Sequence, residues 1–233
     1  MNAKRMQGFT LIEIAIVLVI IGLLLGGILK GQELITSARV RNLISQQDGV
    51  RAAFYGFQDR YRALPGDYSV ATTNIQGSST NGDGNGQISD GTTVESNLVW
   101  EHLSKAGFIN GNYTYAATVA GETVVPKNPY GQFIRLAWDT TYLVPDGGTA
   151  VARHNLKTGN QIPVAIVAEV DRKIDDGIPS TGSFVFAQWS QGGTSDPAAP
   201  GASGCATTPA PGNPGNWNLT SNTQVNCGAA TLM

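Results

Sequence analysis

Residues 9–30, FTLIEIAIVLVIIGLLLGGILK, decide the fold of this chain. Every residue from Ile14 to Leu29 is apolar or glycine. As an α-helix at about 1.5 Å per residue, the stretch spans a hydrocarbon core of about 30 Å. Lys4 and Arg5 precede it, so the positive-inside rule places the N-terminus in the cytoplasm. The one charge within it is Glu13. Such a charge costs about 2.5–3.5 kcal/mol on insertion scales and is usually functional.

A cleaved secretory signal is the main alternative, because a basic leader followed by an apolar run has the same outline. No small-residue cleavage site follows Leu29, and the chain continues directly into KGQELI. The string GFTLIE at residues 8–13 instead resembles the class III signal of type IV prepilins and pseudopilins, and the likeness covers about the first 30 residues. It implies that a prepilin peptidase and N-methyltransferase cuts between Gly8 and Phe9 and methylates Phe9.

Cleavage would expose a cationic amine on Phe9 close to an apolar medium, and this amine is the expected partner of Glu13. A desolvated amine and a desolvated carboxylate are each costly alone, and pairing offsets much of that cost. Contact within one helix is possible at this spacing. The resemblance implies instead that the amine of one subunit meets the glutamate of its neighbour. The pair would then set the register of a subunit that enters a filament.

Gly22, Gly26 and Gly27 in the apolar run allow two interpretations. The spacing GLLLG at 22–26 fits a close approach of two helices. Each glycine also loosens a helix by up to about 1 kcal/mol, and the resemblance implies that this segment partly unwinds in many pilin filaments. Related proteins often carry a helix-breaking proline here, but this chain has none before Pro65. Which glycine yields, if any, stays open.

Composition and charge agree with an exported structural protein. The net charge is −2 and only 14% of the residues are charged, so the chain offers no basic field for nucleic acid. Cys205 and Cys227 are the only cysteines. In an oxidising compartment we expect them to form a disulfide bond worth about 3 kcal/mol; the other interpretation is two unrelated thiols. A C-terminal disulfide loop also resembles type IV pilins more than the core pseudopilins of type II secretion.

Beyond the membrane the helix continues as an amphipathic segment. Apolar residues recur at helical spacing from Val40 to Tyr61, with Gln47 the one polar break. The sequence ALPGD at 63–67 ends the helix, because the residue before a proline avoids the helical region and a glycine follows. We therefore expect an α+β protein with the type IV pilin fold. In that fold a long N-terminal helix packs on an antiparallel β-sheet head with a C-terminal disulfide loop.

The expected organisation has five parts. A leader peptide (1–8) precedes a transmembrane or filament-core helix (9–30) and an amphipathic helix (31–63). A globular α+β head (64–191) follows and is long enough for a hydrophobic core. The Pro/Gly-rich C-terminal disulfide loop (192–233) has few core-forming residues, so we expect it to be an extended surface loop.

The segment NGDGNGQI at 81–88 places oxygen ligands at alternate positions, as a calcium loop of the D-x-[DN]-x-[DN]-G-x-I type does. The candidate calcium ligands are Asn81, Asp83, Asn85 and Gln87. The match is incomplete, because asparagine stands at the first position and Thr92 replaces the bidentate glutamate at the twelfth. Asp90 or Glu95 is able to complete the shell, and neither choice is forced. The alternative is a flexible Gly/Asn turn.

Local patterns give a coarse secondary structure for the head. TTVE at 92–95 is a capping box, Thr92-x-x-Glu95, that opens a short helix. His102 falls on this helix, and we interpret it as a structural or surface residue. The strand-like segments are 132–139, 141–144 and 183–189. Residues 162–170 fit a strand by their Val/Ile content, or a helix by Pro163 at a helix start and apolar residues at helical spacing.

We expect no catalysis. His102 and His154 are the only histidines, neither lies in an HExxH motif or beside a nucleophile motif, and the chain has no P-loop and no GxSxG. The expected function is that of a structural subunit of a type IV pilus. It is made as an inner-membrane prepilin, cleaved after Gly8, methylated on Phe9 and polymerised through its N-terminal helix. Its expected partners are copies of itself and other pilins, the prepilin peptidase and the inner-membrane assembly platform.

Two other functions stay open. A pseudopilin of a type II secretion system would form a short periplasmic filament that supports protein export. A tip pilin that binds DNA is disfavoured, because no basic cluster occurs outside Lys4, Arg5 and scattered arginines. The cysteine pair and the chain length favour the pilus subunit, which would serve adhesion, motility or surface interaction at the cell surface.

Overall fold

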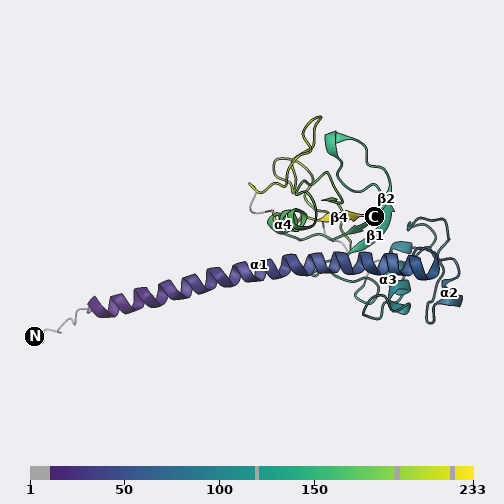
Figure 1. Cartoon of the computed structure of the whole chain (residues 1–233), viewed down its shortest axis with the longest axis horizontal. Helices are drawn as coiled ribbons and strands as arrows, with labels where there is room; N and C mark the ends of the chain where they lie inside the picture. The colour runs from purple at the N-terminus through teal and green to yellow at the C-terminus, as the bar shows by residue number, and fades with distance from the viewer. Residues whose placement is uncertain (1–10, 119–120, 192–194, 221–223) are drawn as a thin grey trace, which may run out of the picture. The chain divides into compact units, whose positions relative to one another are not determined.

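The computed structural model describes residues 11–118, 121–191, 195–220 and 224–233. The chain divides into two compact units, Met1–Arg39 and Val40–Met233. The long helix α1 (Leu11–Tyr61) contributes residues to both units (Figure 1). The division therefore falls within the segment that the sequence predicts to be an amphipathic helix.

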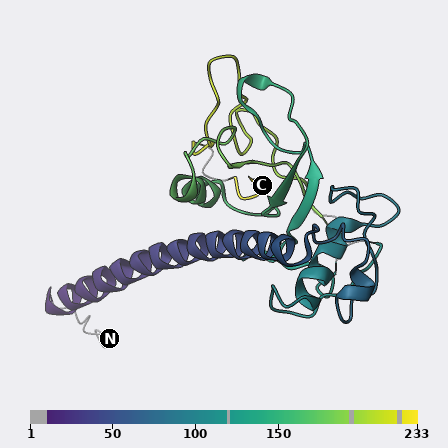
Figure 2. The same ribbon diagram turned by 45° about the vertical axis from the view of Figure 1, so that its right-hand side comes forward.

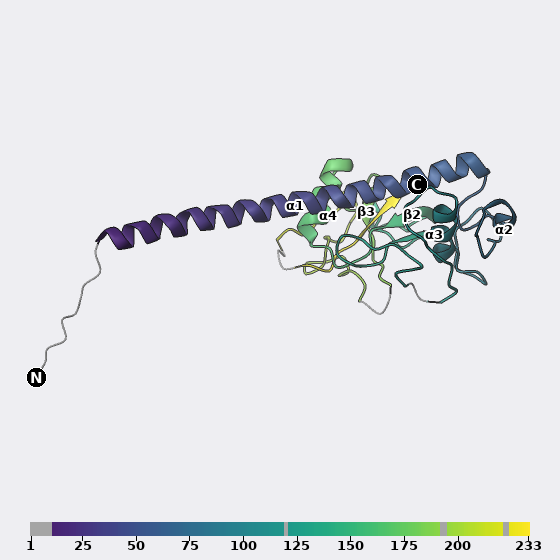
Figure 3. The ribbon, with the colours of Figure 1, turned by 90° about the horizontal axis from the view of Figure 1, so that it is seen from below.

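Helix α1 is continuous for 51 residues, and Figure 3 shows it as one unbroken ribbon. None of Gly22, Gly26 and Gly27 interrupts it, and a Cβ at any of the three would meet no atom within 4 Å. The helix ends at the predicted ALPGD turn. Arg62 there takes a positive φ of 54° and Gly66 one of 89°, and a positive φ cannot continue a right-handed helix.

Four short strands form one antiparallel sheet in the order β1-β2-β4-β3. The strands are β1 (Arg135–Asp139), β2 (Arg153–Lys157), β3 (Phe184–Phe186) and β4 (Ala229–Leu232). The sequence predicted β1 and β3, but it missed β2 and β4. The predicted strand at 141–144 is wrong, because the chain turns there into a single 3-10 turn, Pro145–Gly147.

Strand β4 lies inside the sheet although its residues are among the last of the chain (Figures 1 and 2). It pairs with β2 on one side and β3 on the other. The expectation that all of residues 192–233 form an extended surface loop is therefore wrong at its C-terminal end. The sequence AATL is too short and too weakly β-forming to be recognised alone, and pairing on both sides makes it a strand.

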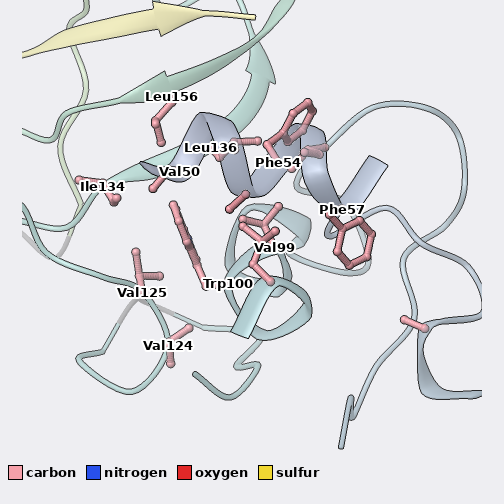
Figure 4. Close-up of a cluster of buried hydrophobic side chains, with 14 of the residues drawn as sticks. Val50, Phe54, Phe57, Val99, Trp100, Val124, Val125, Ile134, Leu136 and Leu156 are labelled. Atoms are coloured by element: carbon pink, nitrogen blue, oxygen red, sulfur yellow. The ribbon is translucent and has the colours of Figure 1, made fainter. Parts of the chain in front are cut away.

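The second half of α1 supplies the centre of the head's core, as its apolar periodicity predicted. Val50, Phe54 and Phe57 of α1 are buried together with Trp100 and the inward-facing Leu136 of the sheet (Figure 4). Full burial of such side chains stabilises by about 1.5–3 kcal/mol each. A second buried cluster joins the Val40 end of this helical segment to α4 (Val164–Ile174), β3 and the disulfide.

Gln47 is not a break in this stripe. Its side chain is 1% exposed, and its Oε1 accepts a hydrogen bond from Thr231 Oγ1 of β4 at 2.9 Å. A buried polar group must be hydrogen-bonded to avoid a desolvation cost of about 1–3 kcal/mol. The Oε1 of Gln47 is thus matched by Thr231, while its buried Nε2 has no hydrogen-bond partner among the described residues, and the one bond links α1 to the last strand.

The other helices resolve two local patterns. Residues 162–170 belong largely to α4, so the helical interpretation holds. The capping box is wrong: α3 (Glu95–Lys105) has Val94 at its N-cap position with no side-chain cap. Glu95 is buried and its carboxylate accepts hydrogen bonds from the preceding loop, which removes it from the capping role. His102 on α3 is fully buried, so it is a structural and not a surface residue.

The predicted disulfide is present. Cys205 and Cys227 are bonded with a Cα–Cα distance of 5.6 Å, and both residues are fully buried. Cys227 also exchanges two backbone hydrogen bonds with Ile162, just ahead of α4. These two hydrogen bonds therefore hold Cys227, which lies just before β4, to the residues that lead into α4. Through the disulfide they also hold the loop around Cys205.

Truncation of Phe57 tests the role of α1 in the head's core. We expect Phe57→Ala to lower the free energy of unfolding of the head by about 3–5 kcal/mol, because the ring is 0% exposed. The adjacent Gln58→Ala is the control: Gln58 is exposed, and its loss should change stability by less than about 0.5 kcal/mol. Urea unfolding followed by tryptophan fluorescence measures both, and equal effects would contradict the packing described above.

Candidate functional site

The first half of α1 presents an apolar surface that no described residue of its own unit covers. All large aliphatic side chains between Leu11 and Leu29 are exposed, by 46% to 89%. Among the described residues, α1 is the one helix long and apolar enough to span a membrane, judged by length and composition, with a mean hydropathy of 2.9 over its best window. A continuous apolar face of this size requires lipid or the apolar helices of other subunits.

Glu13 lies in the first turn of α1. The unsatisfied N–H groups at a helix N-terminus favour a carboxylate there by about 0.3–1 kcal/mol. Gly8 and Phe9 lie outside the described residues, so the predicted cleavage site and the predicted amine partner of Glu13 are not placed by the structure. Glu13 lies near the start of the exposed apolar surface, and its predicted role in assembly stays a prediction.

The second candidate site is formed where the loop 81–88 folds against two acidic residues from elsewhere in the chain. Asp67, Asp83 and Glu95 each place a carboxylate oxygen within 4.8 Å of the other two. Asp67 and Glu95 are buried and Asp83 is exposed. None of the three forms an ion pair with a lysine or arginine of the described chain.

Backbone N–H groups of the loop point at the two buried carboxylates. Asp67 accepts hydrogen bonds from the N–H groups of Asn85 at 2.9 Å and Gly86 at 3.0 Å. Glu95 accepts from those of Asp83 at 2.9 Å and Ser89 at 3.0 Å. Burial nevertheless raises the pKa of both Asp67 and Glu95, and the backbone hydrogen bonds offset only part of that effect. Ionised carboxylates are therefore costly here, and a bound cation would offset the cost.

Of the four predicted calcium ligands, Asp83 alone belongs to this cluster of three carboxylates. Asn81 Oδ1 accepts a hydrogen bond from the Thr72 N–H at 2.9 Å, and Asn85 Oδ1 accepts from the Gln87 N–H at 2.7 Å. These amide oxygens are thus already used to shape the loop. In the contact with Asn85, Gln87 takes part through its backbone N–H and not through its side chain.

The structure also decides which acids accompany the loop. Glu95 joins Asp83, whereas Asp90 forms an ion pair with Arg135 at 2.7 Å. Sequence reasoning missed Asp67 as a candidate ligand, because it lies in the ALPGD turn well before the loop. The signal available was an acidic residue directly after a forced helix end, which only the folded chain brings next to Asp83.

Two other polar clusters have structural roles. Asp171 of α4 accepts a hydrogen bond from Trp217 Nε1 at 2.6 Å and so holds the disulfide loop to the helix; burial raises the pKa of Asp171 to about 6. Lys157 of β2 is 1% exposed and pairs with Asp139 of β1 at 2.8 Å. Burial lowers the pKa of Lys157 to about 8, and the Asp139 carboxylate partly counters this.

Comparison with known proteins gives one match. Residues 3–29 match the prokaryotic N-terminal methylation motif. No curated protein and no solved structure shows significant similarity to the chain. The matched residues contain Glu13 and nearly all of the exposed apolar surface of α1. This motif is the class III signal typical of type IV pilins and pseudopilins, which are non-enzymatic proteins. The chain therefore carries this motif in front of an α+β head.

Proposed function

We propose that this protein is a structural subunit of a type IV pilus. The observation that carries the proposal is the exposed apolar half of α1, with Glu13 at its start, within residues that match the N-terminal methylation motif. The precursor is held in the inner membrane by this helix. The mature subunit then leaves the lipid and packs the same apolar face against the helices of other subunits in a filament.

Processing supplies the group that directs this assembly. The prepilin peptidase cuts between Gly8 and Phe9 and methylates the new amine of Phe9. In the filament that amine pairs with Glu13 of a neighbouring subunit, because both charges are costly alone in an apolar core. Only a subunit in the right register satisfies both charges, so the pair selects register during growth.

The head is built to persist outside the cell. Its last strand lies inside the sheet and is preceded by a buried disulfide, so the C-terminus is held by covalent and hydrogen bonds. A C-terminal disulfide loop favours a pilus subunit that functions at the cell surface in adhesion, motility or surface interaction. Copies of the chain, other pilins and the inner-membrane assembly platform are its partners in this proposal.

A pseudopilin of a type II secretion system is the alternative, since the methylation motif is typical of both classes. A pilus extends from the cell surface, whereas a pseudopilus stays in the periplasm. Filaments sheared from the cell surface that contain this chain as a subunit would support the pilus. A loss of protein export on deletion of the chain, with no surface filaments in the parent strain, would support the pseudopilus.

Substitution at the cleavage site tests the processing step. We expect Gly8→Val to leave an uncleaved precursor in the membrane, because a β-branched side chain blocks the position where the peptidase of this class requires glycine. Mass spectrometry of the N-terminus measures cleavage and methylation together. Gly22→Ala is the control: a Cβ at Gly22 meets no atom within 4 Å, so this variant should be processed normally. Normal mature protein from Gly8→Val would contradict the proposal.

Removal of the Glu13 charge tests the assembly step separately. We expect Glu13→Gln to be inserted and cleaved normally but to lower the yield of filaments by at least about tenfold, because the unpaired amine costs several kcal/mol. Glu33→Gln is a matched control on the same helix. Glu33 is exposed and pairs with Lys30 at 2.8 Å, and such surface pairs contribute little. Equal filament yields from the two variants would exclude the register role of Glu13.

We also propose that the loop 81–88, together with Asp67 and Glu95, binds a calcium ion. Two observations support this proposal. The loop has the spacing of oxygen-bearing residues that begins a calcium loop. Three carboxylates also converge there without a lysine or arginine partner. Asp67, Asp83 and Glu95 would provide charged oxygens, which are the ligands that calcium prefers.

Calcium titration of the full chain in detergent tests this site. We expect calcium at about one hundred times its Kd to stabilise the head by about 2.7 kcal/mol, and EDTA to reverse the effect. Asp83→Asn should abolish the response. Asp59→Asn, an exposed acid on α1, should leave it unchanged. Equal melting temperatures in calcium and in EDTA would count against a structural ion.

A further inference from the structure

The only two histidines of the chain hold the two ends of one segment, residues 66–88. His102 of α3 accepts a hydrogen bond through Nδ1 from the backbone N–H of Gly66 at 2.9 Å. His154 of β2 accepts through Nε2 from the backbone N–H of Ile88 at 3.2 Å. Both contacts join the segment to residues far away in the sequence, so each one is a tertiary link and not a turn contact.

The partners determine the protonation state of both rings. A backbone N–H only donates, so the nitrogen that faces it carries no proton. The other nitrogen of His102, Nε2, faces the carbonyl oxygen of Thr80 at 3.1 Å and therefore donates. Both histidines must be neutral in this structure. A protonated imidazole has a donor at both nitrogens, which would oppose one N–H to another at Gly66 and at Ile88.

The surroundings of His102 disfavour its charged form. The ring is fully buried and lies parallel to Phe57 of α1, with 6.2 Å between ring centroids. Burial lowers the pKa of His102, and this outweighs the Thr80 carbonyl and the neighbouring Glu101 carboxylate, which both act to raise it. Glu101 is the one charged group that contributes to this balance.

The surroundings of His154 act in the same direction. Its ring is half-buried between Phe54 of α1 and Trp138 of β1, with centroid distances of 6.0 Å and 4.7 Å. Burial alone lowers the pKa of His154, and no charged group contributes. The acid nearest in sequence on that strand, Asp139, is paired with Lys157 at 2.8 Å.

Loss of these two contacts would affect more than the segment's ends. Gly66 lies in the turn that follows α1, and Ile88 is fully buried in the core with its carbonyl oxygen bonded to the Trp138 N–H at 2.7 Å. Between them the segment carries the acidic loop described above. Detachment at Gly66 and Ile88 would therefore remove one contact of the segment with α3 and one with the sheet, and would leave the contacts that Glu95 and Glu101 make.

We propose that His102 and His154 form a pH-sensitive clamp on residues 66–88, which opens when the pH falls below the ordinary pKa of histidine. Each ring has a lower pKa in the folded state than its ordinary value of about 6.5. Above about pH 6.5 neither state takes up a proton, so the clamp is at full strength. As the pH falls from there toward the folded-state pKa, the open state binds protons that the closed state refuses, and the closed state loses stability.

A local measurement is needed, because other groups titrate in the opposite sense. The pKa values of Asp67 and Glu95 are raised by burial, so protonation of these acids favours the closed segment at low pH. Glu101 also holds the segment, through the Ser79 N–H at 2.6 Å. The melting temperature of the whole head mixes these contributions, whereas hydrogen exchange reports on the segment itself.

Hydrogen exchange of the full chain in detergent, corrected for the intrinsic dependence on pH, tests the clamp. Between about pH 7.5 and pH 5 we expect amide protection in residues 66–88 to fall by about tenfold or more. Protection around Val40 and Leu43 of α1, which pack in the other buried cluster, should stay unchanged. In the double variant His102→Gln/His154→Gln, a glutamine side-chain oxygen can accept the same hydrogen bonds without titrating, so protection of the segment should no longer depend on this pH range.

Two results would overturn the proposal. One is unchanged protection of residues 66–88 in the wild-type chain at about pH 5, and the other is an equal loss of protection in the double variant. If the double variant does not fold, NMR titration of the two imidazoles in the wild-type chain decides the question. Values below about 6.5 for both support the clamp, and values at or above 6.5 contradict it.

Discussion

Helix α1 must satisfy two opposite environments with one unbroken backbone, and the rest of the structure depends on this constraint. Its first half has no protein of its own unit to cover its aliphatic side chains, whereas Val50, Phe54 and Phe57 in its second half are the centre of a buried core. The helix is continuous across this change. Only at ALPGD does it leave the helix, because proline and a positive φ exclude further helical turns.

The segment that follows contains one short helix, α2 (Ala71–Asn74), and is otherwise held largely by side chains that accept its backbone hydrogen bonds. Backbone N–H groups of residues 66–89 are bonded to the buried side chains of Asp67, Glu95, Glu101 and His102, and to His154. A Gly/Asn-rich sequence forms few backbone pairs of its own, so it takes its shape from these side chains. The conformation of this segment therefore depends on the charge of the side chains that hold it.

Several elements could be predicted because their signals are local. The period of the apolar residues predicts α1 and its buried stripe, the Phe/Val-rich run predicts β3, and export with two cysteines predicts the Cys205–Cys227 bond. The predictions are wrong where a residue distant in the sequence determines the local structure. Thr92 has the pattern of a helix cap, but Glu95 is taken by the loop. The sequence AATL has no strand signal of its own until β2 and β3 pair with it on both sides.

The amino-acid sequence by itself determined the nature of this protein: a class III signal, one acidic residue in an apolar helix, an amphipathic continuation and a chain without catalytic motifs. These features act within a few helical turns, so residue type and spacing are sufficient to recognise them. Only the tertiary structure decided that Asp67 and Glu95 accompany Asp83, that β4 lies inside the sheet, and that two neutral histidines hold Gly66 and Ile88. Each of these is a contact between residues far apart in the sequence, and burial in the folded head sets both its geometry and its charge state.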